Sequence, residues 1–209
     1  LLSHILQIDR YYLDLYNQAS DREAQVNACR AAVTHLFAYF GWLRGVETFG
    51  VTWDDVNVVE PRDGPIHGLP RGVGVILLKL LPQTKSSQAA TADVVMAYRS
   101  ASGLCPGLWL QRLRALLPAS ELVGEAYVIA HANGRPWTSH YYRYTFFYPT
   151  LYMLRALGDK YPSKYDESPG LELIRAFWSF NTLRRTARSV VAKKRAETLR
   201  KASPAETVE

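Results

Sequence analysis

Cysteine is scarce in this sequence, which argues against two common kinds of site. The 209 residues include two cysteines, Cys29 and Cys105, which stand far apart in the chain. Neither belongs to a Cys-x-x-Cys pair or a histidine series, so the sequence predicts neither a disulfide framework nor a zinc site. His67, His131 and His140 also lack a spacing typical of metal ligands. We therefore expect reduced, intracellular cysteines and no metal or cofactor.

Long apolar runs and several catalytic motifs are also missing. No uninterrupted apolar stretch is long enough to span a bilayer, and the chain opens without a charged-then-apolar leader. Gly-x-x-x-x-Gly-Lys, His-Glu-x-x-His and Gly-x-Ser-x-Gly do not occur, which gives little support to a phosphate-loop enzyme, a zinc protease or a serine hydrolase. The first residue is Leu1 rather than methionine, which favours an excised domain.

The composition predicts a globular protein with an uneven charge. Hydrophobic residues make up 48% of the chain, enough for residues 1–209 to bury a core as a single unit. The net charge is +6, but residues 183–201 are strongly basic whereas the first sixty residues lean acidic. A local basic face favours a polyanionic partner, and a solvated helix with its basic residues outside explains the same run equally well.

Apolar periodicity predicts several helices. Apolar residues recur at three and four positions from Ser3 to about Tyr39, which indicates two helices broken near Ser20 and Asp21. Either of these two residues can cap the second helix. A short amphipathic helix is expected over residues 106–117.

A further helix is expected from His140 to Leu157, with Thr138 or Ser139 as its cap and Gly158 at its end. Its aromatic residues allow two interpretations, a platform for stacking nucleic-acid bases or the filling of a core and an interface. Core filling is the simpler one, because aromatics on a helix point in all directions. The residues concerned are Tyr141, Tyr142, Tyr144, Phe146, Phe147, Tyr148 and Tyr152.

Three segments rich in apolar and β-branched residues predict strands. They cover residues 51–59, 72–81 and 93–98. A polar turn, residues 83–87, separates the last two and contains Lys85. We therefore expect a mainly α-helical domain with a small antiparallel sheet that presents Lys85 near a turn.

Two stretches contain arginines in positions suited to an anion. In Gly41-x-x-Arg44-x-x-Glu47, Arg44 follows an apolar helix at a glycine-marked turn. Such an arginine is either paired, here with Glu47, or held ready for an anion. In the second stretch Asn181 can cap a helix, which would place Arg184 and Arg188 on one face beside its N-terminus. The alternative is ordinary surface charge.

The order of these stretches resembles tyrosine recombinases, the phage-integrase family of DNA breaking and rejoining enzymes. Residues 41–56, which end in Trp-x-Asp-Val, resemble the first catalytic-arginine box. Residues 181–185 resemble the second box, His-x-x-Arg, in everything but the histidine. Residues 81–85 resemble the strand-turn lysine, and residues 134–138 resemble the Gly-x-Pro-x-Thr/Ser turn. All four occur in the family's order, and the resemblance covers roughly residues 26–195.

The resemblance implies roles for individual residues. Arg44 and Arg184 would clamp a phosphate of duplex DNA, Lys85 would protonate the leaving 5′ oxygen, and Glu47 would support the first arginine. A tyrosine nucleophile would hold the 3′ end covalently without metal or cofactor. Further DNA contacts are expected from the basic residues after the second box, namely Arg185, Arg188, Lys193 and Lys194. The implied fold is mainly helical with a small three-stranded antiparallel sheet.

Two departures from the family pattern concern catalysis. Asn181 replaces the box histidine, and no tyrosine follows Arg184 in this sequence. We expect a catalytic-domain-like unit with its core at about residues 20–195, without the N-terminal DNA-clamp domain or the C-terminal nucleophile segment, and inactive alone. It would be intracellular and associated with DNA, in a nucleus or in a bacterial cytoplasm, and would self-associate there. The alternatives are a non-catalytic DNA-binding remnant of a mobile element and a helical interaction protein.

Overall fold

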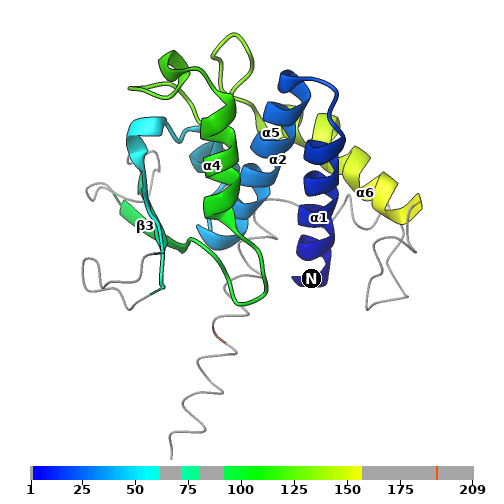
Figure 1. Cartoon of the computed structure of the whole chain (residues 1–209), viewed down its shortest axis with the longest axis horizontal. Helices are drawn as coiled ribbons and strands as arrows, with labels where there is room; N and C mark the ends of the chain where they lie inside the picture. The colour runs from blue at the N-terminus through cyan, green and yellow to red at the C-terminus, as the bar shows by residue number, and fades with distance from the viewer. Residues whose placement is uncertain (1, 62–71, 81–91, 157–191, 193–209) are drawn as a thin grey trace, which may run out of the picture.

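The computed structural model describes residues 2–61, 72–80, 92–156 and 192 (Figure 1). Within these residues the chain is mainly helical with a three-stranded antiparallel sheet, as the sequence predicts. The longer helices are α1 (Leu2–Gln18), α2 (Arg22–Phe40), α4 (Pro106–Leu116) and α6 (Tyr148–Ala156). The short elements are α3 (Gly45–Phe49), α5 (Ser139–Tyr142), the 3-10 turns η1 (Trp53–Asp55) and η2 (Ala119–Glu121), and the π-helical turn η3 (Arg143–Phe147).

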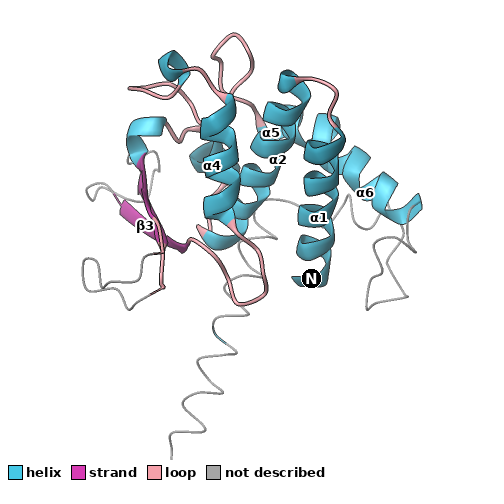
Figure 2. Ribbon diagram, in the orientation of Figure 1, coloured by secondary structure: helices cyan, strands magenta, loops and turns pink. Residues whose placement is uncertain are grey.

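Helix α2 forms the centre of the helical part. Most of its residues are buried, and α1 and α4 run beside it (Figures 1 and 2). It begins after Asp21, whose carboxylate Oδ1 accepts the backbone N–H of Ala24 at 2.7 Å. The predicted break between the first two helices is thus confirmed, with Asp21 rather than Ser20 as the cap. No helix of the described segments is both long enough and apolar enough to cross a membrane.

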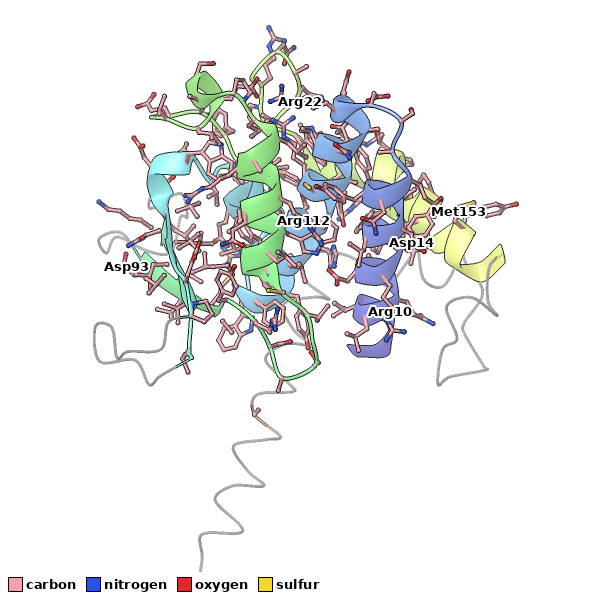
Figure 3. All side chains as sticks on the ribbon, in the orientation of Figure 1. Arg10, Asp14, Arg22, Asp93, Arg112 and Met153 are labelled. Atoms are coloured by element: carbon pink, nitrogen blue, oxygen red, sulfur yellow. The ribbon has the colours of Figure 1, made fainter. Side chains whose placement is uncertain are left out.

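Polar contacts join α4 to α1. The indole Nε1 of Trp109 donates to Asp9 Oδ1 at 2.8 Å. The guanidinium of Arg112, which is labelled on α4 in Figure 3, lies over the rings of Tyr16 and Trp109, at 5.2 and 4.8 Å from their centroids. Burial is the main cause of a raised Asp9 pKa, which the Trp109 hydrogen bond and the Arg112 charge partly offset. These contacts hold α1 and α4 together.

The sheet has the order β1 (Val56–Val59), β2 (Val75–Leu80), β3 (Ala92–Ala97). Alternate residues turn one face of it toward the core, where Ile76, Leu78 and Met96 are buried. The last two strands lie close to the predicted ranges, but β1 begins later than expected. Its predicted first half instead forms η1, because Asp55 Oδ2 accepts the N–H and hydroxyl of Thr52 at 3.0 and 2.7 Å.

The aromatic segment is divided among α5, η3 and α6. Its start is capped by Thr138, whose hydroxyl oxygen accepts the Tyr141 N–H at 3.1 Å. Tyr142 and Phe147 are buried, which confirms core filling for these two residues. Tyr144 and Tyr152 are 60% and 61% exposed, so they do not fill the core, and for them an interface role stays a prediction. The π-helical turn within this segment has no counterpart in the apolar pattern.

His35 is buried in α2, where the centroid of its ring lies 5.5 Å from the centroid of the Tyr12 ring. Burial lowers the His35 pKa from 6.5 to about 4. Below pH 6.5 the unfolded chain therefore binds a proton that the folded chain refuses, so stability falls as the pH falls through this window. We expect the free energy of unfolding to drop by about 2 kcal/mol between pH 7 and pH 5.

Urea titrations of the wild type and of His35→Leu at both pH values measure this drop. The leucine variant removes the titrating group and keeps an apolar side chain of similar size, so its pH-dependent loss should be smaller by about that amount. Equal losses in both proteins would show that His35 does not cause the pH dependence.

Candidate functional site

The connection from α2 to α3 starts at a glycine that touches the sheet. Gly41 ends α2, and its N–H donates to the Phe37 carbonyl at 2.9 Å. A Cβ atom at this position would lie 2.8 Å from that carbonyl oxygen and 2.9 Å from the Met96 sulfur. The Met96 sulfur ends a flexible side chain that could shift, but the carbonyl belongs to the backbone, so the contact with the carbonyl is the one that requires glycine here.

The next three residues alternate between surface and core. Trp42 is 36% exposed, Leu43 is 1% exposed, and Arg44 is exposed again. Trp42 has a φ of 55°, and no other non-glycine residue of the described segments has a positive φ. The buried Leu43 fixes this connection to the core, which leaves Trp42 and Arg44 on its outer side.

The backbone of Arg44 is held by α3, of which it is the N-cap residue. Its N–H donates to the Glu47 carboxylate Oε2 at 2.6 Å. Its carbonyl accepts the backbone N–H of Thr48 at 2.8 Å and the Thr48 hydroxyl at 2.9 Å. Three hydrogen bonds thus fix the point from which the Arg44 side chain extends.

The Arg44 guanidinium has no hydrogen bond or ion pair with any residue that the structure describes. The predicted alternative, an ion pair with Glu47, is not formed, because that carboxylate binds the backbone of Arg44 instead. Arg44 is exposed, so its guanidinium is accessible to a partner in solution. An arginine with a fixed backbone and an accessible head is suited to an oxyanion.

The other carboxylates that follow Arg44 are also engaged by local groups. Asp54 Oδ1 accepts the Gly124 N–H at 3.1 Å. Asp55 accepts from Thr52, as described above. These acidic residues, like Glu47, therefore serve the local fold, and none of them forms an ion pair with the Arg44 guanidinium.

The segment that follows Arg44 contacts the chain on either side of a second motif. The Val128 N–H donates to the Val51 carbonyl at 3.0 Å, and the Trp53 N–H donates to the Ala126 carbonyl at 2.9 Å. The ring centroids of Phe49 in α3 and Tyr142 in α5 lie 6.4 Å apart. The Arg44 segment therefore packs against the segments on both sides of the predicted Gly-x-Pro-x-Thr/Ser turn, residues 134–138.

The other predicted site residues lie outside the described residues. Lys85 belongs to the connection between β2 and β3. The structure describes the strand residues on either side of this connection, Leu80 and Ala92, which pair with each other. The remaining predicted residues, also outside, are Asn181, Arg184, Arg185, Arg188, Lys193 and Lys194. Their roles stay predictions.

Neither cysteine is placed for nucleophilic chemistry. Cys29 and Cys105 are free and buried. Burial raises the pKa of the Cys29 thiol to about 12, which keeps it protonated and unreactive at neutral pH. Within the described ranges no three His, Cys, Asp or Glu side chains are grouped to hold a metal ion.

Sequence reasoning missed Trp42. A positive φ is usually signalled by glycine or asparagine, and a tryptophan gives no such signal. Its exposure was also unforeseeable, because it depends on how Leu43 enters the core. The indication in the sequence was its place, two residues before Arg44.

Comparisons with known proteins add no assignment. Neither the protein-family models nor the curated proteins contain a match to this sequence.

The two roles of Arg44 and Glu47 can be separated by stability measurements. Glu47→Ala removes a cap from α3, and we expect it to lower the free energy of unfolding by about 1 kcal/mol. Arg44→Ala keeps the backbone N–H and should cost less than about 0.5 kcal/mol.

The coupling free energy between the two side chains is measured by urea denaturation of both single variants and the double variant. We expect it to be within about 0.3 kcal/mol of zero. A larger favourable coupling would indicate an ion pair between the two side chains and a structural role for the guanidinium.

Proposed function

We propose that this chain is a duplex-DNA-binding domain of the tyrosine recombinase type, in which Arg44 contacts a backbone phosphate. The observation that carries the proposal is the accessible Arg44 guanidinium on a backbone fixed by Glu47 and Thr48. The basic residues of the second arginine box, including Arg184, support it from the sequence.

Arginine at this position suits a phosphate for two physical reasons. Its planar guanidinium offers paired N–H donors that match two phosphate oxygens, which a lysine ammonium does not. The backbone is already ordered before binding, so only the side chain loses freedom when the phosphate arrives. The same fixed donors would stabilise the charge that grows on the non-bridging oxygens during phosphoryl transfer.

The reaction that the resemblance implies is a transesterification. A tyrosine oxygen attacks phosphorus and loses its proton, the bond from phosphorus to the 5′ oxygen breaks, and that oxygen takes up a proton. Lys85 would donate the proton that the 5′ oxygen takes up, and Arg44 and Arg184 would hold the phosphate. One phosphodiester replaces another, so neither metal nor ATP is required.

A non-catalytic DNA-binding domain is the second candidate. Asn181 favours it, because a neutral amide can donate and accept hydrogen bonds but cannot take up the proton that a histidine could. In such a domain Arg44 would still bind a phosphate, but Lys85 and Asn181 would take part in no reaction. The two candidates therefore differ in cleavage, not in binding.

Fluorescence anisotropy with a labelled duplex at low salt tests the shared claim. We expect the variant Arg44→Ala/Arg184→Ala to bind at least about tenfold more weakly than the wild type, because two charged phosphate contacts are lost. Arg10→Ala is the matched control, an exposed arginine on α1 outside both boxes (Figure 3), and should change the affinity little.

The outcomes separate the candidates. Unchanged binding by the double variant would contradict a phosphate clamp, and absent or salt-insensitive binding by the wild type would favour a helical interaction protein. If binding depends on the arginines, the test for cleavage needs a chain extended beyond Glu209 by a segment that contains a tyrosine, because no tyrosine follows Arg184 here. That longer chain is incubated with a nicked duplex, and denaturing electrophoresis tests for a covalent protein–DNA product. A covalent product would favour the recombinase, and its absence the non-catalytic domain.

A further inference from the structure

Aromatic residues recur at every fourth position along α5, η3 and α6 (Figure 1). We call the four of them the aromatic row: His140, Tyr144, Tyr148 and Tyr152. The ring centroids of His140 and Tyr144 lie 4.4 Å apart, and those of Tyr144 and Tyr148 lie 5.3 Å apart. The first three rings therefore follow one another along the helical segment, and Tyr152 stands at the next position of the series.

The π-helical turn η3 helps to keep the aromatic row on one side of the helical segment. An α-helix has 3.6 residues per turn, so residues four apart drift around it by roughly 40° at each step. At the end of η3 the Tyr148 N–H donates to the carbonyl of Arg143, five residues earlier, which widens the turn and counters this drift. Because π-helical turns are rare and occur frequently at functional sites, one that aligns surface side chains indicates a use for that surface.

The aromatic row lies at the surface. Tyr144 and Tyr152 are 60% and 61% exposed, and His140 is exposed as well. The other side of the same segment fills the core, where Tyr142 and Phe147 are buried. The two interpretations that the sequence allows for these aromatics therefore concern different residues. Core filling accounts for the buried side, and the stacking platform remains for the exposed row.

The charge of this stretch favours an anionic partner. Residues 126–158 contain no aspartate or glutamate, although they include the basic residues Arg135 and Arg143. Arg135 is exposed and Arg143 is half-buried. Neither guanidinium forms a hydrogen bond or an ion pair with a residue that the structure describes. Positive charge beside exposed rings, without acidic residues in the same stretch, complements a polyanion.

Exposed rings combined with positive charge are typical of surfaces that bind single-stranded nucleic acid. There the bases stack on aromatic side chains while basic groups follow the phosphates. In a duplex the bases are stacked on one another, so their faces are not accessible to a protein side chain, whereas unpaired bases can turn outward. A tyrosine suits such a contact because its ring face is apolar and its hydroxyl stays in water.

We propose that the aromatic row binds a single strand of nucleic acid, with unpaired bases stacked on Tyr144 and Tyr152 and the phosphates near Arg143. This goes beyond the proposed duplex contact of Arg44, because it concerns another surface and another form of nucleic acid. The two contacts belong to neighbouring elements, since α3, of which Arg44 is the N-cap, packs against α5. Either contact can exist without the other.

Fluorescence anisotropy with two labelled strands separates stacking from charge. One is a single-stranded oligothymidylate of about 20 nucleotides, long enough for the site sizes usual in such proteins. The other is an abasic strand of the same length, which keeps the phosphates and lacks the bases. We expect the wild type to bind the oligothymidylate at least about fivefold more tightly, because only that strand can stack.

Matched variants identify the rings. Tyr144→Ala/Tyr152→Ala should bind the oligothymidylate at least about tenfold more weakly, keep the wild-type salt dependence, and bind the abasic strand like the wild type. Tyr144→Phe/Tyr152→Phe keeps both rings and should retain wild-type affinity. Val123→Ala, which truncates a residue 62% exposed outside the row, is a further control. Because all three positions are exposed, each variant should keep its Tm within about 4 °C.

Equal affinity of the wild type for the two strands would overturn the proposal, and so would wild-type affinity in the alanine variant. A loss of affinity that occurs only with a matching loss of Tm would overturn it too, because the rings would then serve the fold. Sedimentation velocity tests the other use of such a face. A dimer that the alanine substitutions dissociate, with binding unchanged, would assign the row to contacts between copies of this chain.

The duplex experiment remains a separate test. A chain that fails to bind duplex DNA but binds the oligothymidylate through Tyr144 and Tyr152 would contradict the role of Arg44 and support the aromatic row. A chain that binds duplex DNA through Arg44 and does not distinguish the two single strands would support the former and overturn the latter.

Discussion

The burial of Leu43 between the end of α2 and the start of α3 is the constraint on which the region around Arg44 depends. Just before it, Gly41 ends α2 at a place where a Cβ atom would lie 2.8 Å from the Phe37 carbonyl oxygen. The chain that leaves α2 must then turn at once, with Leu43 entering the core behind it. The end of α2, this turn and the start of α3 thereby form a corner, on which Arg44 is exposed.

The carboxylates near this corner serve its backbone. Glu47, Asp54 and Asp55 accept hydrogen bonds from backbone N–H groups of the same or a neighbouring segment. An acidic stretch would ordinarily neutralise a nearby arginine, but here the Arg44 guanidinium has no ion pair with these groups. The acidic character of the first sixty residues and an anion-binding role for Arg44 are therefore compatible.

Much of the fold could be predicted from local patterns. Apolar spacing located α1, α2 and α4, and β-branched runs located β2 and β3, because burial on one face imposes a period on the sequence. The start of β1 was placed too early, since the capping of η1 by Asp55 depends on a hydrogen bond rather than on hydrophobicity. The π-helical turn η3 likewise leaves no mark in the apolar pattern.

The candidate site could be predicted only in part. Arg44 was recognisable because it follows a glycine-marked helix end, and Glu47 because it stands three residues later. That Glu47 binds the backbone of Arg44, not its guanidinium, required the structure. The strain at Trp42 also required it, since a positive φ at a tryptophan results from its fixed neighbours and not from its own preference. Lys85 and Arg184 remain predictions.

The most direct test of the central claim is the salt dependence of duplex-DNA affinity in the wild type and in Arg44→Ala. If Arg44 holds one phosphate, the slope of log affinity against log salt concentration should decrease in magnitude by about one in the variant. Identical slopes would contradict the account, because they would show that the guanidinium neutralises no phosphate and that the corner at Gly41 presents Arg44 for some other purpose.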